Sequence, residues 1–266
     1  MATPTTGLAR DDRAAVDKAI SLLVAFGDKA GTGVGVSELA RRARLSKSTA
    51  YRVLGMLERN GVVEREGTDY RLGERLHHLG RAVYAPGAET VRDFLQPYLS
   101  DLYEMTRQTV HLAVLHGTDV VYLAKLYGHR AAPVPSRIGG RLPAHATAVG
   151  KLLLAYDADA AARAIGVPLH RFTDRTITDP KRLAAELERI RRDGIAYDEQ
   201  ESRPGLNCVA APVLAPRGTA VAALSVAGAH DQAELRRLST DVRRVAAAAS
   251  QAWASRGTRR RTRATL

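Results

Sequence analysis

The 266-residue chain has a single cysteine, a single tryptophan and only 5% aromatic residues. One cysteine excludes an internal disulfide and most cysteine-based metal sites. The apolar runs near 208–214 and 220–227 are too short to cross a bilayer, and no basic-then-apolar signal opens the sequence. We therefore expect a soluble, cytoplasmic protein with no membrane partner.

Signatures of catalysis are also missing. The eight histidines contain no His-Glu-x-x-His pair, and there is no Gly-x-x-x-x-Gly-Lys-Ser/Thr run to hold phosphates. A nucleophilic triad can be imagined from Cys208, Asp198 and either His111 or His145. Their local sequence resembles neither a nucleophile elbow nor an activated-cysteine motif. We expect no catalytic residue, no metal and no cofactor.

Acidic residues are in deficit, and the net charge is +12. The excess is spread over the chain, with +3 in residues 1–90, +4 in 91–254 and +5 in the last twelve. The overall charge therefore supports a nucleic-acid partner only weakly. The arginine-rich tail, 255–266, is expected to be disordered.

Residues 36–57 have the pattern of a helix-turn-helix that enters DNA. Ser37 can cap the first helix, whose inward face carries Leu39, Ala40 and Ala43, and Ser46 is placed to cap the second. The second helix has an apolar stripe of Ala50, Val53, Leu54 and Leu57. Hydrogen-bond donors follow its cap, as a recognition helix requires, and we expect DNA contacts from Arg41, Lys47, Ser48, Thr49, Tyr51 and Arg52. The alternative is an ordinary helical hairpin with a solvated basic face.

The flanking segments favour the first interpretation. Val16, Ile20, Leu23 and Val24 recur at helical spacing and predict a supporting helix that closes a three-helix core. Two strand-like runs in 61–72, joined near Gly67, predict a hairpin. This is the element order of a winged helix, in which Arg71 would contact DNA from the wing, while Tyr70 would either do so or cover the core.

The remainder of the chain mixes helices and strands, which implies an α+β domain. Leu76, Leu79 and Val83 lie on one face of a predicted linking helix and are candidates for a dimer interface. Helices are expected near 91–105, 147–156, 180–192 and 232–253, with mostly antiparallel strands near 109–115, 120–126, 195–198, 209–214 and 220–226.

From about Asp17 to Trp253, the chain resembles the IclR family of bacterial transcriptional regulators. The resemblance is carried by the segments 46–52, 70–73, 142–151, 194–201, 208–213 and 223–228, in this order and spacing. It implies a winged helix-turn-helix domain at 10–73, a linking helix at 74–90 and a GAF-like effector-binding domain at 91–254. Arg44 departs from the family, which usually has glycine in this turn; a left-handed conformation costs a non-glycine residue roughly 1 kcal/mol.

The resemblance also implies a ligand-responsive regulator that binds double-stranded operator DNA as a homodimer, commonly paired into a tetramer. We expect a repressor of a catabolic or carbon-source operon, with an activator as the alternative. A ligand-independent architectural DNA binder would not need a second domain of this size.

Carried over by position, the resemblance places a small-molecule effector near Ala146, Thr147, Asp198, Cys208 and Ser225. A helix starting near Ala146 would favour a carboxylate at its N-terminus. Each residue has a plainer alternative, since Cys208 could be core, Asp198 could cap a turn and Ser225 could face either side of its strand. Arginines in the loop 128–143 (Arg130, Arg137 and Arg141) would either meet the carboxylate or be solvated.

Overall fold

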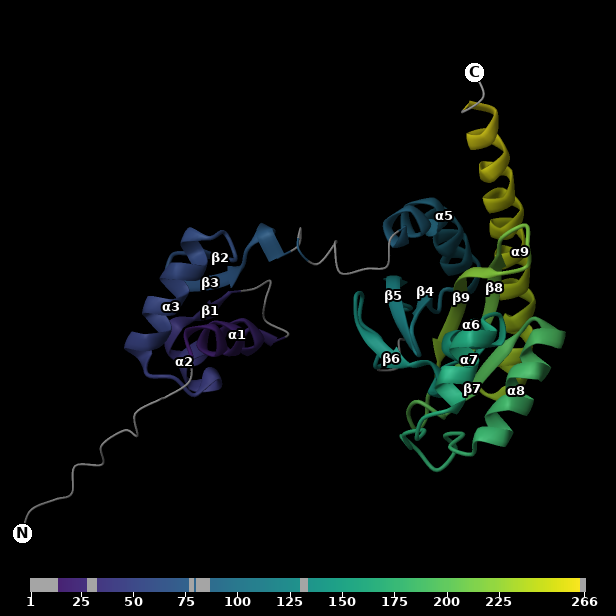
Figure 1. Cartoon of the computed structure of the whole chain (residues 1–266), viewed down its shortest axis with the longest axis horizontal. Helices are drawn as coiled ribbons and strands as arrows, with labels where there is room; N and C mark the ends of the chain where they lie inside the picture. Colours follow the sequence, from purple (N-terminus) through teal and green to yellow (C-terminus); the bar gives the residue numbers. More distant parts are fainter. Residues whose placement is uncertain (1–13, 28–32, 77–78, 80–86, 130–133, 264–266) are drawn as a thin grey trace, which may run out of the picture. The chain divides into compact units, whose positions relative to one another are not determined.

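The computed structural model describes residues 14–27, 33–76, 79, 87–129 and 134–263, with only the backbone for 257–263. The chain divides into two compact units, one ending at Tyr84 and the other beginning at Ala85. Figure 1 labels the elements of both.

The first unit is a three-helix domain with a small sheet. Its helices are α1 (Ala15–Ala25), α2 (Val36–Ala43) and α3 (Lys47–Arg59). The antiparallel sheet has the order β1-β3-β2, from Val34–Gly35, Asp69–Leu72 and Val63–Glu66. The hairpin of β2 and β3 follows α3 directly, so the predicted winged helix-turn-helix is present. Leu39, Ala40 and Ala43 are buried as expected.

The face of α1 that packs inward differs from the prediction. Val16, Ile20 and Val24 are 71%, 54% and 73% exposed, whereas Leu22 and Phe26 are fully buried. Leu22 lies two residues from both Ile20 and Val24, which places it about 200° around the helix from them. The β-branched residues resemble a core face in sequence, but Leu22 and Phe26 occupy the core, and of the predicted residues only Leu23 packs against it.

The helix-turn-helix confirms two expectations, at Arg44 and Ser46, and corrects one, at the start of α2. Gly35, not Ser37, precedes the first residue of α2, because β1 keeps the chain extended through Gly35 while it pairs with Asp69. Arg44 is left-handed, with φ 54° and ψ 48°, so it does take the conformation that glycine usually supplies. Ser46 caps α3 by accepting a hydrogen bond from the Thr49 N–H.

The second unit contains a six-stranded sheet in which every neighbouring pair is antiparallel. The strand order is β6-β5-β4-β9-β8-β7. In chain order the strands are β4 (Thr109–His116), β5 (Asp119–Leu126), β6 (Arg141–Pro143), β7 (Ala196–Glu199), β8 (Asn207–Leu214) and β9 (Ala220–Gly228).

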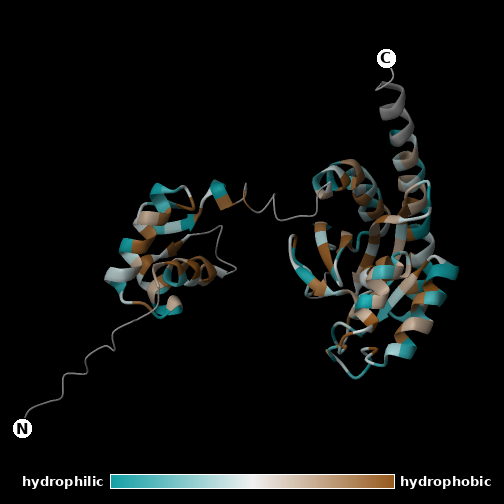
Figure 2. Ribbon diagram, in the orientation of Figure 1, coloured by the Kyte–Doolittle hydropathy of each residue, from teal (hydrophilic) through white to brown (hydrophobic). Residues whose placement is uncertain are grey.

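Helices cover both faces of this sheet (Figure 1). They are α5 (Ala88–Thr106), α6 (Ala148–Ala155), α7 (Ala158–Ile165), α8 (Pro180–Asp193) and α9 (Gln232–Arg263). The strands are mainly hydrophobic, whereas α8 carries many hydrophilic residues (Figure 2). Small side chains on one sheet face, including Ala113, Ala210 and Ala223, pack in one core with α6 and let that helix approach closely.

On the other face, α5 and α9 pack against the strands and against each other. Phe94 of α5 and Trp253 of α9 meet edge to face, with ring centroids 5.3 Å apart. The guanidinium carbon of Arg256 lies 5.2 Å from each ring centroid.

Helix α7, the end of α9 and the linking segment differ from the predictions or test them only in part. Helix α7 was not predicted. Helix α9 continues to Arg263, so the expected disorder of 255–266 is wrong as far as that residue, because no proline interrupts the helical pattern. The linking helix begins at residue 74, but Val83 and most of 77–86 lie outside the described residues.

Candidate functional sites

Helix α3 presents a polar surface opposite its buried stripe. Ala50, Val53 and Leu54 are buried, whereas the side chains expected to meet base edges and phosphates are mainly exposed: Lys47, Ser48, Tyr51 and Arg52. Thr49 is half-buried, and its hydroxyl accepts a hydrogen bond from Ser46 Oγ at 2.9 Å. The cap therefore fixes the first turn of the helix, where the predicted DNA contacts are concentrated.

Two of the predicted DNA-binding arginines are held by carboxylates. The Arg41 guanidinium lies 2.6 Å from Glu38, and the hydrogen bonds from Arg41 and Arg42 lower the pKa of Glu38 to about 2. On the wing, Arg71 Nη2 lies 2.8 Å from Glu66 Oε2. Each arginine would exchange a carboxylate for a phosphate when it binds DNA. Tyr70 is 2% exposed, so it covers the core.

Four of the five predicted effector-binding residues line one cavity between α6 and the sheet. These are Thr147, Asp198, Cys208 and Ser225, which come from four separate segments of the chain. The cavity volume is about 20 Å³, which is room for about one water molecule. Ala146 is buried in the 3₁₀ turn Ala144–Ala146 and does not line the cavity.

Helix α6 begins at the cavity, and its first residue, Ala148, lies within two residues of the expected start. Thr147 is its N-cap, and Thr147 Oγ1 accepts a hydrogen bond from the Gly150 N–H at 3.0 Å. A Cβ on Gly150 would lie 2.2 Å from the Ala144 carbonyl oxygen, so only glycine lets the 3₁₀ turn pack against α6. The N-cap and the first two residues of α6, Thr147, Ala148 and Val149, line the cavity.

Asp198 does cap a turn as well as line the cavity. Its Oδ1 accepts hydrogen bonds from the Glu201 and Ser202 N–H groups, at 2.7 and 3.3 Å, and its Oδ2 accepts one from Ser202 Oγ at 2.6 Å. Burial raises the pKa of Asp198 against the opposing effect of these bonds. Asp198 therefore shapes the cavity through the turn between β7 and β8.

Four polar residues of the cavity were not predicted: His111, Tyr122, Ser136 and Ser202. His111 Nε2 lies 2.7 Å from Ser136 Oγ, and Nδ1 lies 3.3 Å from Ser225 Oγ. Burial, with the nearby charge of Lys125, lowers the pKa of His111 to about 3, so the imidazole is neutral. The cross-strand pair His111–Ser225 could have been found by aligning the two predicted strands; Ser136, in an irregular loop, left no such signal.

Two of the three loop arginines do not reach this cavity. Arg137 and Arg141 are exposed and are not among its lining residues, while Arg130 lies outside the described residues. The polar part of the cavity is therefore formed by the sheet, Thr147 at the start of α6, Ser136 and Ser202.

Family models match both units of the chain. The model of the IclR helix-turn-helix domain matches residues 15–67, and that of the bacterial transcriptional regulator IclR C-terminal domain matches 87–253. The chain belongs to the IclR family. It is therefore a DNA-binding transcriptional regulator with an N-terminal winged helix-turn-helix and a C-terminal GAF-like domain.

Relatives of known role agree. The regulator XynR of Escherichia coli is 34% identical over 244 residues, covering 89% of this chain and 96% of XynR. The transcriptional repressor AllR of E. coli is 31% identical over 221 residues, covering 80% of this chain and 79% of AllR. Both are regulators, not enzymes.

Solved structures share the fold over most of the chain. The crystal structure of Thermotoga maritima IclR has a TM-score of 0.76 at 31% identity and covers 90% of this chain and 98% of that one. An IclR homolog from Microbacterium hydrocarbonoxydans, in complex with 4-hydroxybenzoate, has a TM-score of 0.73 at 27% identity and covers 91% and 100%.

The IclR-family assignment leaves no role for the imagined triad. Burial raises the pKa of the Cys208 thiol to about 12, so the nucleophilic thiolate is disfavoured. His145 Nε2 is engaged with the His170 carbonyl oxygen at 2.9 Å, and His111 with two serines. Within the described ranges, no helix is long and apolar enough to span a membrane, and no group of three or more metal-ligand side chains is placed to hold an ion.

Proposed function

We propose that this IclR-family protein is a repressor that leaves its operator when a small carboxylate binds in the cavity between α6 and the sheet. The observation that carries the proposal is the convergence of Thr147, Asp198, Cys208 and Ser225 on one buried cavity. These positions are separated by up to 78 residues of sequence, yet their side chains share one enclosed space.

The chemistry of the cavity favours an anionic ligand with a polar substituent. The N-terminus of α6 supplies backbone N–H groups and the positive end of a helix dipole, which attract a carboxylate. Ser225, Tyr122 and neutral His111 can donate or accept hydrogen bonds at the sheet side. The 4-hydroxybenzoate bound by the Microbacterium homolog is a carboxylate with a hydroxyl group.

A ligand larger than water must enlarge the cavity, which offers a route to regulation. Its walls include the turn after Asp198 and the segment around Ser136, which the ligand would move. A ligand shifts a two-state equilibrium only if it binds one state better, and the coupling to DNA is typically about 1–3 kcal/mol and reciprocal. Repression is the sign we propose, as in AllR.

We propose double-stranded operator DNA as the partner of a homodimer, paired into a tetramer. The DNA contacts would come from Arg41, Lys47, Ser48, Thr49, Tyr51, Arg52 and Arg71. Two-fold operators need two recognition helices about 34 Å apart, which one chain cannot supply.

The test screens a panel of carboxylates (acetate, pyruvate, glyoxylate and 4-hydroxybenzoate) for thermal stabilisation, then for release of operator DNA. A ligand at 100 times its Kd stabilises the folded state by about 2.7 kcal/mol. Ser225→Phe should abolish the response while operator binding stays at the ligand-free level. Thr240→Phe, with the same ring at an exposed position of α9, should respond normally.

Two outcomes would overturn the proposal. A normal ligand response in Ser225→Phe would place the effector elsewhere. Lower transcription of the regulated genes after deletion of this protein would identify an activator instead of a repressor.

A further inference from the structure

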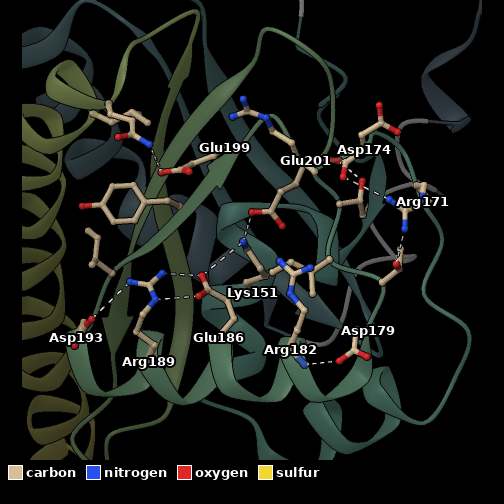
Figure 3. Close-up of a pocket in the computed structure, with 18 of the residues that line it drawn as sticks. Lys151, Arg171, Asp174, Asp179, Arg182, Glu186, Arg189, Asp193, Glu199 and Glu201 are labelled. Carbon is tan, nitrogen blue, oxygen red and sulfur yellow. Dashed lines mark hydrogen bonds and ion pairs between the residues drawn. The ribbon is translucent and has the colours of Figure 1, made fainter.

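A second and much larger cleft lies beside α8, separate from the effector cavity. Its volume is about 850 Å³, and it is formed by α6, the segment 171–182, α8, β7 and the start of α9. Figure 3 shows the charged side chains that line it, with Lys151 at its centre. This volume lies within the range of about 300–1,000 Å³ that is usual for small-molecule sites.

The floor of the cleft is a balanced set of charges. Lys151 is 1% exposed, and its Nζ contacts Glu201 Oε1 and lies 3.7 Å from Glu186 Oε1. Arg189 forms two hydrogen bonds to Glu186, at 2.7 and 2.9 Å. Two cations therefore offset two carboxylates, and the floor by itself does not select a cation or an anion.

One oxygen of this floor has no partner. Glu201 is 6% exposed, and its Oε2 is buried with no hydrogen-bond partner in the described part of the chain. Buried polar atoms are nearly always hydrogen-bonded, because an unpaired one loses its bonds to water without replacement. Oε2 is thus an acceptor that a hydroxyl group entering the cleft could satisfy.

Two hydrogen bonds to the main chain of Glu201 fix its position. Thr176 Oγ1 donates to the Glu201 carbonyl oxygen at 2.7 Å, and the Glu201 N–H donates to Asp198 Oδ1 at 2.7 Å. The side chain therefore extends from a braced turn in the wall of the cleft, with its unpaired oxygen buried just behind the surface.

The rim of the cleft has an excess of unpaired positive charge. Among the residues that the structure describes, three lining arginines have guanidinium groups with neither an ion pair nor a hydrogen bond: Arg175, Arg182 and Arg236. Figure 3 shows the Arg182 side chain rising from α8 into the cleft. Most lining carboxylates are engaged, as Asp179 is by capping α8 and Asp193 by Arg189 and Arg192. Asp174 has the one lining carboxylate in the described ranges without such a contact.

We propose that this cleft is a second small-molecule site, and that it binds a hydroxylated carboxylate. Guanidinium groups at the rim would hold the carboxylate, and Glu201 Oε2 would accept a hydrogen bond from a ligand hydroxyl. The same turn faces both sites, because Asp198 and Ser202 line the effector cavity while Glu201 lines the cleft. A ligand in the cleft would therefore brace one wall of the effector cavity.

Isothermal titration of the full chain with D-gluconate tests the proposal, with acetate and glycerol as ligands that keep only the charge or only the hydroxyls. Gluconate should bind with one site per chain and at least about tenfold more tightly than either. The double variant Arg182→Gln/Arg236→Gln should raise the Kd of gluconate by about tenfold or more. The neighbouring pair Lys181→Gln/Arg237→Gln removes the same charge from the same helices outside the cleft and should leave the Kd unchanged.

Three results would each overturn the proposal. Gluconate would bind no better than acetate, the two double variants would behave alike, or Ser225→Phe would lose gluconate binding because the ligand sits in the effector cavity. The titration contains no DNA, so its failure is distinct from a failure of the proposed repressor function.

Discussion

At the scale of the residue, the neutral state of His111 has a consequence for stability. Its pKa is about 3 in the folded protein, because burial and Lys125 oppose the charged form, against an ordinary value of about 6.5. Below pH 6.5, His111 is therefore protonated in the unfolded chain but stays neutral in the folded one. The free energy of unfolding should therefore fall as the pH drops from about 6.5 to about 3, by up to about 1.4 kcal/mol per pH unit.

The variant His111→Gln should remove this dependence. Calorimetry between pH 6.5 and 4.5 gives the free energy of unfolding of the effector domain as a function of pH. The slope of this curve should correspond to about one proton fewer taken up on unfolding than in the wild type. His116→Gln, at the half-exposed end of the same strand, is the matched control and should keep the wild-type slope. Equal slopes in all three proteins would show that folding does not lower the pKa of His111.

For the buried pair of Lys151 and Glu201, we predict that removing Lys151 alone lowers the free energy of unfolding more than removing both partners. Lys151→Met leaves Glu201 without a cation, while Glu186 keeps Arg189, and should lower the free energy of unfolding by about 3–5 kcal/mol. The double variant Lys151→Met/Glu201→Leu should be more stable than Lys151→Met, because one unpaired carboxylate is removed with its partner. Urea denaturation measures both, and Lys181→Met, exposed at the start of α8, should change little. A double variant less stable than the single one would contradict this account.

At the scale of the element, α3 separates two kinds of DNA contact. Arg52→Ala should cost about 1–3 kcal/mol of operator binding and relax preference at one base position. Lys47→Ala should weaken all sequences alike and reduce the salt slope by about 1. Fluorescence anisotropy over a salt series measures both effects, with Arg59→Ala at the far end of α3 as the control. Unchanged binding by folded Arg52→Ala and Lys47→Ala would refute the assignment of the recognition helix.

The elements also show what sequence alone could predict. The cap at Ser46 and the left-handed Arg44 depend on local chemistry, and both were predicted. The inward face of α1 was wrong because apolar residues lie on two sides of that helix, and tertiary packing selected Leu22 and Phe26. The effector residues came from the family resemblance, whereas His111, Ser136 and the cleft around Lys151 depend on strand pairing and loop packing that have no local signature.

At the scale of the whole molecule, the proposed repressor must present two recognition helices together. Leu79 of the predicted linking helix is 57% exposed, which leaves an apolar side chain available to a second copy. Leu79→Glu should shift light scattering toward the monomer at micromolar concentration and weaken operator binding. Val167→Glu, which adds the same charge at a position 52% exposed in the effector domain, should remain dimeric. A monomeric wild type with full operator affinity would contradict the dimer.

Trp253, which contacts Phe94, allows the unfolding of the two units to be followed by different spectroscopic signals. Trp253 is the sole indole of the chain, so tryptophan emission arises entirely from the unit that begins at Ala85. Trp253 of α9 packs edge to face on Phe94 of α5, so its emission should change when the two helices separate. Far-ultraviolet circular dichroism, by contrast, records helix loss in both units. Comparing the two signals along one denaturation curve would resolve the stability of each domain in the intact regulator without any label.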